Sequence, residues 1–196
     1  MDKLPARRIR RIAVYCGSNV GKGDAYTQAA AELGAEIARR GIGIVYGGTH
    51  KGLMGALADA ALAAGGDVHG VITERLAGLG HLHPAITSHE IVAGMRARKT
   101  KMADMADAFI AMPGGIGTTE EFVEVWTLNQ LGYFDKPVGL LDVEGFFQPF
   151  LRFIDEMVER LFLPAAHRDS LVVHAGAADL VGGLITAPAL SGSKWM

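Results

Sequence analysis

The sequence predicts an α/β fold in three layers, in which a mostly parallel sheet of about six strands carries helices on both faces. Two observations predict this class. Short apolar runs rich in β-branched residues alternate with longer segments of helical periodicity, which is typical of parallel strands joined by crossover helices. The chain has 196 residues, 49% of them hydrophobic, so it can bury one core, and we expect residues 1–196 to form a single domain.

The predicted elements follow one another along the chain. A strand at 9–16 precedes a helix at 24–40, which Asp24 caps and Gly41 ends. Residues 73–88 show no periodicity and are interpreted either as a loop near the site or as plain disorder. Further strands are expected at 43–46, 68–72, 89–93, 108–112 and 137–141. Further helices are expected at 53–64, 95–106, 119–131, 146–161 and 177–184, the last within a weakly charged stretch, 170–193, interpreted as a surface helix with an irregular tail.

The charge balance excludes some classes of function. Lys and Arg number 19 against 21 Asp and Glu, so the formal net charge is -2 and the field that draws proteins onto nucleic acid or anionic membranes is missing. The single cysteine, Cys16, cannot form a disulfide within the chain, which fits a reducing cytoplasm. The apolar run at 12–16 is too short for a signal peptide or a membrane span.

Two glycine-rich turns are candidate phosphate sites. Residues 47–52 and 114–118 each join a predicted strand to a predicted helix, where backbone N–H groups can approach a ligand oxygen at the positive end of the helix. Neither turn has the Gly-Lys-Ser/Thr of a Walker loop or the dinucleotide spacing G-x-G-x-x-G. The alternative interpretation is that these glycines only form tight turns.

Acidic residues crowd the helix that follows the second turn. Thr118 and Glu121 have the T-x-x-E spacing of a capping box, in which each side chain satisfies a backbone donor. Glu120 and Glu124 add more acid than a cap requires, which favours a functional interpretation, although acids also suit the helix dipole.

Basic residues open the helix predicted at 95–106. Arg96, Arg98 and Lys99 lie where the helix dipole disfavours positive charge, which indicates a nearby anion. The alternative is a solvated surface helix that happens to begin with bases.

No metal and no cofactor is predicted. His81, His83 and His89 match no standard zinc spacing. His50 and Lys51 resemble the histidine-lysine pair of pyridoxal-phosphate decarboxylases, but the serine two residues before that histidine is absent and such folds need a far longer chain.

Two motifs carry a specific resemblance. Residues 113–121 have the pattern PGGxGTxxE, and Met95-x-x-Arg98-Lys99 lies upstream. Together they resemble the LONELY GUY family of cytokinin riboside 5'-monophosphate phosphoribohydrolases. Family-like pieces at 15–18, 46–48, 52–55, 130–132 and 135–140 extend the resemblance over about residues 9–175. The resemblance implies a Rossmann-like fold, a homodimer, and hydrolysis of the N-glycosidic bond of a nucleoside 5'-monophosphate to free base and ribose 5-phosphate.

The resemblance also implies which residues form the site. Arg98 and Glu121 fall on the family's catalytic pair. The positions associated with the substrate are Lys99, Gly114, Gly115, Ile116, Gly117, Thr118, Thr119, Glu120 and Thr127. The upstream motif adds Met95, and the other family-like pieces add Gly17, Ser18, Gly47 and Gly48.

The chain departs from the family pattern in three places. Arg96 and Ala97 replace the usual His-Glu between Met95 and Arg98, Thr49 replaces a third glycine, and Ile116 replaces an aromatic residue. These changes bear on which base is accepted, prenylated adenine, adenine or another. Two alternatives stay open: a broader nucleoside monophosphate hydrolase, and a non-catalytic carrier of a nucleotide or of molybdenum cofactor, which related Rossmann-like proteins bind.

A mechanism follows from the residue types. Cleavage of the C1'–N9 bond builds positive charge on the sugar and negative charge on the base. Glu121 can stabilise the sugar and orient or deprotonate the attacking water. An arginine guanidinium keeps its charge, so we assign Arg98 not to general acid catalysis but to binding phosphate or ribose and to stabilising developing negative charge. The 5'-phosphate is expected on the N–H groups of residues 114–118, without a metal.

The helix at 119–131 bears on association. It is predicted to expose Phe122, Val125, Trp126 and Leu128 beyond what one sheet face covers, which favours a second copy as a partner. The alternative is a helix fully buried in a single core.

Overall fold

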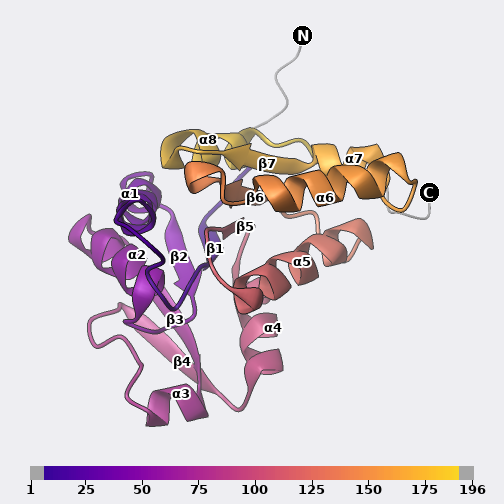
Figure 1. Ribbon diagram of the computed structural model, residues 1–196. Coiled ribbons are helices and arrows are strands. Elements are labelled where there is room, and N and C mark those ends of the chain that lie inside the picture. Colours follow the sequence, from indigo (N-terminus) through magenta and orange to yellow (C-terminus); the bar gives the residue numbers. More distant parts are fainter. Residues whose placement is uncertain (1–6, 190–196) are drawn as a thin grey trace.

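Residues 7–189 are described by a computed structural model, which shows one seven-stranded parallel sheet with helices on both faces (Figure 1). The strand order is β4-β3-β2-β1-β5-β6-β7. The strands are β1 (Arg11–Tyr15), β2 (Gly43–Tyr46), β3 (Val68–Thr73), β4 (Ser88–Val92), β5 (Ala108–Ala111), β6 (Val138–Leu141) and β7 (Leu171–His174). The predicted three-layer α/β fold is confirmed, with one strand more than expected.

The additional strand, β7, lies in the stretch that was expected to be a surface helix. It pairs with β6 from Val138 opposite Leu171 to Leu141 opposite His174 and forms an edge of the sheet. Of its side chains only Leu171 is fully buried. A strand so short and half exposed has neither a long apolar run nor a clear alternation, so the sequence pattern does not reveal it. Residues 190–193 of the predicted tail lie outside the described residues.

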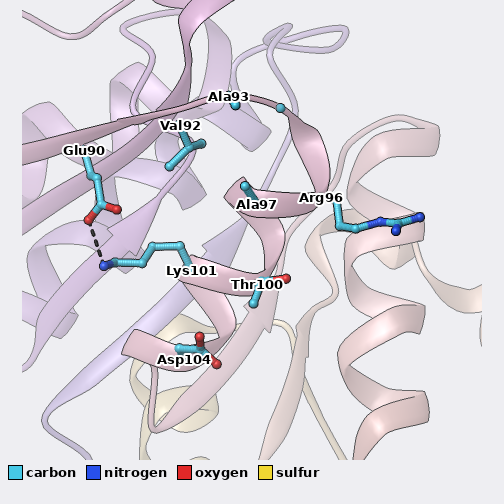
Figure 2. Close-up of a pocket in the computed structure, with 9 residues that line it drawn as sticks. Glu90, Val92, Ala93, Arg96, Ala97, Thr100, Lys101 and Asp104 are labelled. Carbon is cyan, nitrogen blue, oxygen red and sulfur yellow. Dashed lines mark ion pairs between the residues drawn. The ribbon is translucent and has the colours of Figure 1, made fainter.

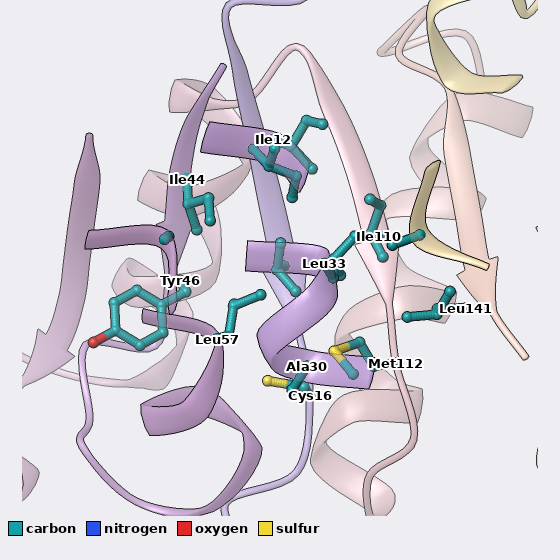
Figure 3. Close-up of a cluster of buried hydrophobic side chains, with 14 of the residues drawn as sticks. Ile12, Cys16, Ala30, Leu33, Ile44, Tyr46, Leu57, Ile110, Met112 and Leu141 are labelled. Carbon is teal, nitrogen blue, oxygen red and sulfur yellow. The ribbon is translucent and has the colours of Figure 1, made fainter. Parts of the chain in front are cut away.

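Two hydrophobic cores cover the two faces of the sheet. One face carries α1 (Ala25–Arg39), α2 (Gly52–Ala63) and α8 (Ala177–Thr186), and Figure 3 shows side chains of this core. The other face carries α4 (Met95–Met105), α5 (Ile116–Gln130) and α6 (Gln148–Glu159). Shorter helices are α3 (Glu74–Gly78), η1 (Val143–Gly145) and α7 (Ala165–Asp169). Within the described residues, no helix has both the length and the apolar character needed to cross a membrane.

Some local predictions need correction. Gly41 ends α1 as expected, with a positive φ of 68°, but the Asp24 side chain makes no hydrogen bond at the N-cap position. The segment predicted as loop or disorder contains α3, which the Thr73 side chain caps by accepting from the Leu76 N–H. Five residues are too few for a helical period to show in the sequence.

The order of the strands locates the site. From β1 the chain moves outward through β2, β3 and β4, then returns to place β5 on the other side of β1. The switch point is therefore between β1 and β5, where the loops after the two strands diverge and leave a crevice for a ligand. The family-like pieces at 15–18 and 113–121 follow these two strands.

The burial of α5 corrects the expected partner surface. Phe122, Val125 and Trp126 are 2%, 2% and 6% exposed, and Leu128 is partly buried. α6 explains the difference, because the ring of its Phe150 lies edge-on to Phe122 with centroids 5.9 Å apart. The alternative of a helix buried in one core is thus right for these side chains, and they give no support to a dimer.

The crossing of α1 and α2 yields a test of the packing. A Cβ at Gly34 would lie 2.2 Å from the carbonyl oxygen of Leu57, so Gly34→Ala should lower the free energy of unfolding by about 1–3 kcal/mol. Gly182 on α8 is the control, since its nearest atom would be Arg40 Nη1 at 3.8 Å. Gly182→Ala should raise the same quantity by about 0.5–1 kcal/mol. Urea denaturation measures both, and equal stability of the two variants would contradict the close crossing.

Candidate functional site

Three loops meet at the carboxyl ends of β1, β2 and β5. The Gly17 N–H donates to the carbonyl of Pro113 at 3.1 Å, and the Leu53 N–H donates to the carbonyl of Gly17 at 3.0 Å. A Cβ at Gly114 would lie 2.2 Å from Thr118 Oγ1 and 2.9 Å from Gly17 N. Close backbone approach therefore brings together the segments 17–18, 47–52 and 113–118, which are distant in the sequence.

The N-terminus of α5 faces this crevice. The helix begins at Ile116 with Gly115 as its N-cap, and no side chain makes a capping hydrogen bond there. The capping-box interpretation is wrong, because Thr118 and Glu121 lie two and five residues inside the helix rather than across its start. The N–H groups of the first turn can therefore bind an anion at the positive end of the helix dipole.

Arg98 is a buried cation. It lies on the first turns of α4 and is 7% exposed. Its Nε donates to the carbonyl of Val71 at 3.0 Å, and Nη1 lies 3.5 Å from Glu121 Oε1 and 3.8 Å from Met95 Sδ. A Cβ at Gly47 would lie 1.9 Å from Nη2, so only glycine leaves room for the guanidinium. The basic residues at the start of this helix predicted a nearby anion. For Arg98, that anion is the carboxylate of Glu121.

Glu121 is buried beside Arg98, with 9% of the residue exposed. Burial raises the pKa of its carboxyl above the usual range, and the positive charge of Arg98 opposes this rise only in part. The 3.5 Å separation is at the limit of hydrogen bonding, so the pair leaves donors of Arg98 and a carboxylate oxygen free to act on a ligand.

Lys99 forms a second, more exposed link between α4 and α5. Its Nζ contacts Glu120 Oε1 and lies 3.2 Å from Glu124 Oε2. The hydrogen bond that Lys99 donates to Glu120 is the main cause of the raised Lys99 pKa. Lys99 and Glu120, expected as separate substrate contacts, therefore contact each other.

Other expected site residues lie in three places: the floor and edge of the crevice, its rim, and the later part of α5. Gly17, Gly47 and Gly48 are buried in the floor of the crevice, and Ser18 is exposed at its edge. Met95 and Ile116 are exposed at its rim, by 49% and 86%. Thr127 is exposed on α5, about 16 Å along the helix from its first residue, so within one chain it lies apart from the phosphate turn.

The sequence reasoning missed one contact of the site. The carbonyl oxygen of Val71, at the carboxyl end of β3, accepts from Arg98 Nε. A main-chain acceptor leaves no mark on residue type, so no sequence signal could have revealed it.

The three histidines do not come together. His83 is buried against Asp59, the His81 ring contacts His50, and His89 is exposed on β4. Within residues 7–189, no three His, Cys, Asp or Glu side chains are arranged to hold a metal ion.

A separate pocket of about 710 Å³ lies between β4 and the outer face of α4 (Figure 2). Glu90 and Lys101 form an ion pair of 2.8 Å at its side, and Arg96 points away from this pair. Arg96 and Ala97, two of the departures from the family pattern, line this pocket. Their substitutions therefore change the outer face of α4 and not the Arg98–Glu121 pair.

Fold and site define a class: a Rossmann-like α/β protein that presents a glycine-rich helix N-terminus and a buried arginine–glutamate pair at its switch point. A family model described as "Possible lysine decarboxylase" matches residues 54–184. The chain is 47% identical over 174 residues to the cytokinin riboside 5'-monophosphate phosphoribohydrolase LOG of Oryza sativa subsp. japonica, covering 89% of this chain and 72% of that protein. It is 45% identical to LOG1 of Arabidopsis thaliana, covering 89% and 82%. The chain therefore belongs to the family of these phosphoribohydrolases, which the family model also covers.

Solved structures agree on the fold. A molybdenum cofactor binding protein from Rippkaea orientalis matches with a TM-score of 0.68 and 21% identity, covering 90% of this chain and 96% of that chain. The molybdenum cofactor carrier protein of Chlamydomonas reinhardtii matches with a TM-score of 0.67 and 23% identity over the same shares. At such identities the likeness concerns the Rossmann-like fold alone.

The electrostatics of the pair can be tested directly. Arg98→Met removes the charge that lowers the pKa of Glu121, so this pKa should rise further. Carbon-13 NMR of the glutamate carboxyls during a pH titration measures it, with Glu121→Gln to assign the signal. Arg96→Met, at an exposed position of the same helix, should leave the titration nearly unchanged. A Glu121 pKa that stays constant or falls in Arg98→Met would contradict the geometry.

Proposed function

We propose that residues 1–196 form one hydrolase domain that cleaves the N-glycosidic bond of cytokinin riboside 5'-monophosphates, or of purine nucleoside 5'-monophosphates such as AMP. The products are the free base and D-ribose 5-phosphate. The names of the relatives support this reaction, and they share 45–47% identity with the chain. The observation that carries the proposal is the buried Arg98–Glu121 pair beside the uncapped N-terminus of α5.

Glu121 supplies the negative charge that the reaction needs. As the C1'–N9 bond lengthens, the sugar becomes oxocarbenium-like, and a carboxylate close to C1' stabilises it. The same carboxylate orients the attacking water and takes its proton as the water oxygen bonds to C1'. The base departs with the electron pair of the C1'–N9 bond and takes up a proton from solvent. A raised pKa makes the Glu121 carboxylate a better base, because a carboxyl that holds a proton more tightly accepts one more readily.

Arg98 serves as a fixed cation. Its guanidinium stays protonated, so it stabilises negative charge on the leaving base or holds the ribose phosphate, and it transfers no proton. The contact to the Val71 carbonyl and the space at Gly47 fix its direction before substrate arrives. Preorganisation of this kind makes the charge effective in the transition state.

The 5'-phosphate binds at the N-terminus of α5 in this proposal. The N–H groups of residues 116–118 and the hydroxyl of Thr118 are the donors, with the helix dipole adding to the attraction. Binding energy at this remote group positions the reacting bond, so its loss lowers the rate as well as the affinity. Lys51, of the histidine-lysine pair that resembles pyridoxal-phosphate decarboxylases, is exposed at the N-cap of α2 and has no role in this proposal.

We further propose that the protein acts as a homodimer in the cytoplasm. The outer face of α5 exposes Ile116, Val123 and Leu131 by 86%, 37% and 38%, and Met95 of α4 lies exposed at the same rim. These apolar side chains, rather than those first expected, support a second copy as the partner. The lone, buried Cys16 fits a reducing compartment.

Release of free base tests the reaction. Purified protein is incubated with isopentenyladenosine monophosphate, AMP, CMP and unphosphorylated isopentenyladenosine, with and without a metal chelator. We expect base from the purine monophosphates, at rates indifferent to chelator, and a kcat/KM at least about 100-fold lower for the riboside. Glu121→Gln should lower kcat by about 100- to 10,000-fold.

The controls separate the outcomes. Glu159→Gln, an exposed glutamate on α6, should leave the rate unchanged. The wild-type rate should fall as pH is lowered through the raised pKa of Glu121, because the protonated carboxyl neither stabilises the sugar nor activates water. No base from any nucleotide, with folded protein confirmed, would overturn the enzyme and favour a cofactor carrier. Equal rates for riboside and monophosphate would overturn the phosphate site.

Association is tested by size-exclusion chromatography with light scattering. We expect a dimer at micromolar concentration, and a monomer for the double variant Val123→Glu and Leu131→Glu, because two buried charges per copy oppose the interface. Phe153→Glu, at a 57% exposed position on α6, is the matched control and should stay dimeric. A wild-type monomer would remove the dimer, and a dimer broken only by Phe153→Glu would move the interface to α6.

A further inference from the structure

The connection between β3 and β4 folds over the glycine loop of the site. The N–H of His83 donates to the carbonyl of Gly48 at 2.9 Å, and the N–H of His50 donates to the carbonyl of His81 at 3.2 Å. Between these two bonds, Thr49 and Leu82 form an antiparallel bridge. Residues 81–83 thus act as a short strand that holds residues 48–50 in place.

The side chain of His83 anchors this short strand. Its ring is 4% exposed, with Nε2 3.0 Å from Asp59 Oδ1 on α2 and Nδ1 3.2 Å from the backbone nitrogen of Ala85. A backbone N–H can only donate, so Nδ1 is the acceptor and the proton of the neutral ring lies on Nε2. The imidazole therefore donates to Asp59 and accepts from Ala85, which fixes its position from two sides.

The loop that His83 holds is the one that contacts Arg98. Gly47 directly precedes Gly48, and a Cβ at Gly47 would overlap the guanidinium at Nη2. Gly48 has a positive φ of 74° and its Cα faces Gly70 and Ile72 of β3, so the loop is packed tightly against the strand that also provides Val71. A shift of this loop would remove the main chain against which Nη2 of Arg98 packs.

We propose that His83 is a positioning residue for Arg98: through Gly48 it fixes the glycine loop against which the guanidinium lies beside Glu121. The inference deepens the proposed hydrolase function and rests on it. His83 does not touch the substrate in this role. It acts by keeping the main chain at Gly47 close to Arg98, so that the cation keeps its direction toward the reacting bond.

Substitutions that remove one contact at a time test the anchor. His83→Asn keeps an acceptor for Ala85 and loses the donor to Asp59, whereas His83→Gln keeps an amide nitrogen near the position of Nε2. We expect His83→Asn to lower kcat by about 10- to 100-fold with KM changed by less than about threefold, because the N-terminus of α5 is untouched. His83→Gln should recover part of kcat, and Asp59→Asn, which still offers an acceptor oxygen, should stay within about threefold of wild type.

A second readout does not depend on the reaction. If His83→Asn releases the guanidinium from Glu121, the carboxyl of Glu121 should titrate at higher pH, toward its value in Arg98→Met. In an Arg98→Met background, His83→Asn should cause no further change in that titration, because the group it acts through is gone. His89→Asn, at an exposed histidine on β4, is the matched control and should change neither kcat nor the titration.

The outcomes separate the two proposals. Wild-type protein that releases no base overturns the proposed function, while the titration still tests the anchor. A wild-type rate with an unchanged Glu121 titration in His83→Asn overturns the positioning role. A lower thermal midpoint with kcat and KM changed together, and no change in the titration, would mean that His83 only stabilises the fold, which also overturns it.

Discussion

A buried positive charge is the constraint on which the site depends. A guanidinium taken out of water is costly unless it finds partners, and Nε and Nη1 of Arg98 find a main-chain carbonyl, a carboxylate and a thioether. These contacts also constrain which residues can stand around Arg98. Residue 47 has no side chain because the guanidinium occupies that space, and Glu121 has to sit deep in α5 rather than at its start. The same contacts therefore set both the charge environment of the pair and the packing at the carboxyl end of the sheet.

Backbone contacts, more than side chains, build the floor of the crevice. Gly52, with a φ of 59°, lies so close to Ser18 that a Cβ would be 2.3 Å from its carbonyl carbon, and a Cβ at Gly114 would be 2.9 Å from the backbone nitrogen of Gly17. Three loops that touch through their main chains have little freedom to move independently. In the proposed function, such a floor offers the phosphate N–H groups whose directions are set before binding, whereas side chains sample several rotamers.

The sequence contains most of the architecture and the pair of residues that we propose as the centre of the site, because both leave local patterns. Buried strands and turn glycines are visible in residue type alone, and Arg98 and Glu121 are found through the resemblance of their motifs to the family. Features that depend on a neighbour distant in the sequence are not. The exposure expected for Phe122 fails because α6 covers it, and the capping box fails because α5 starts at Ile116. The acceptor at Val71 is a carbonyl that every residue type provides.

The pairing of β1 with β5 has a consequence for how the chain acquires its structure. Tyr15 lies opposite Ala111, so the two strands that border the crevice are made half a chain apart, while β1 to β4 pair with strands close to them in the sequence. During synthesis the first four strands can associate as they emerge, but one side of β1 stays open until β5 follows. The crevice between β1 and β5 cannot form before β5 has been made, and until then this edge of β1 lacks its partner strand and is open to wrong pairing.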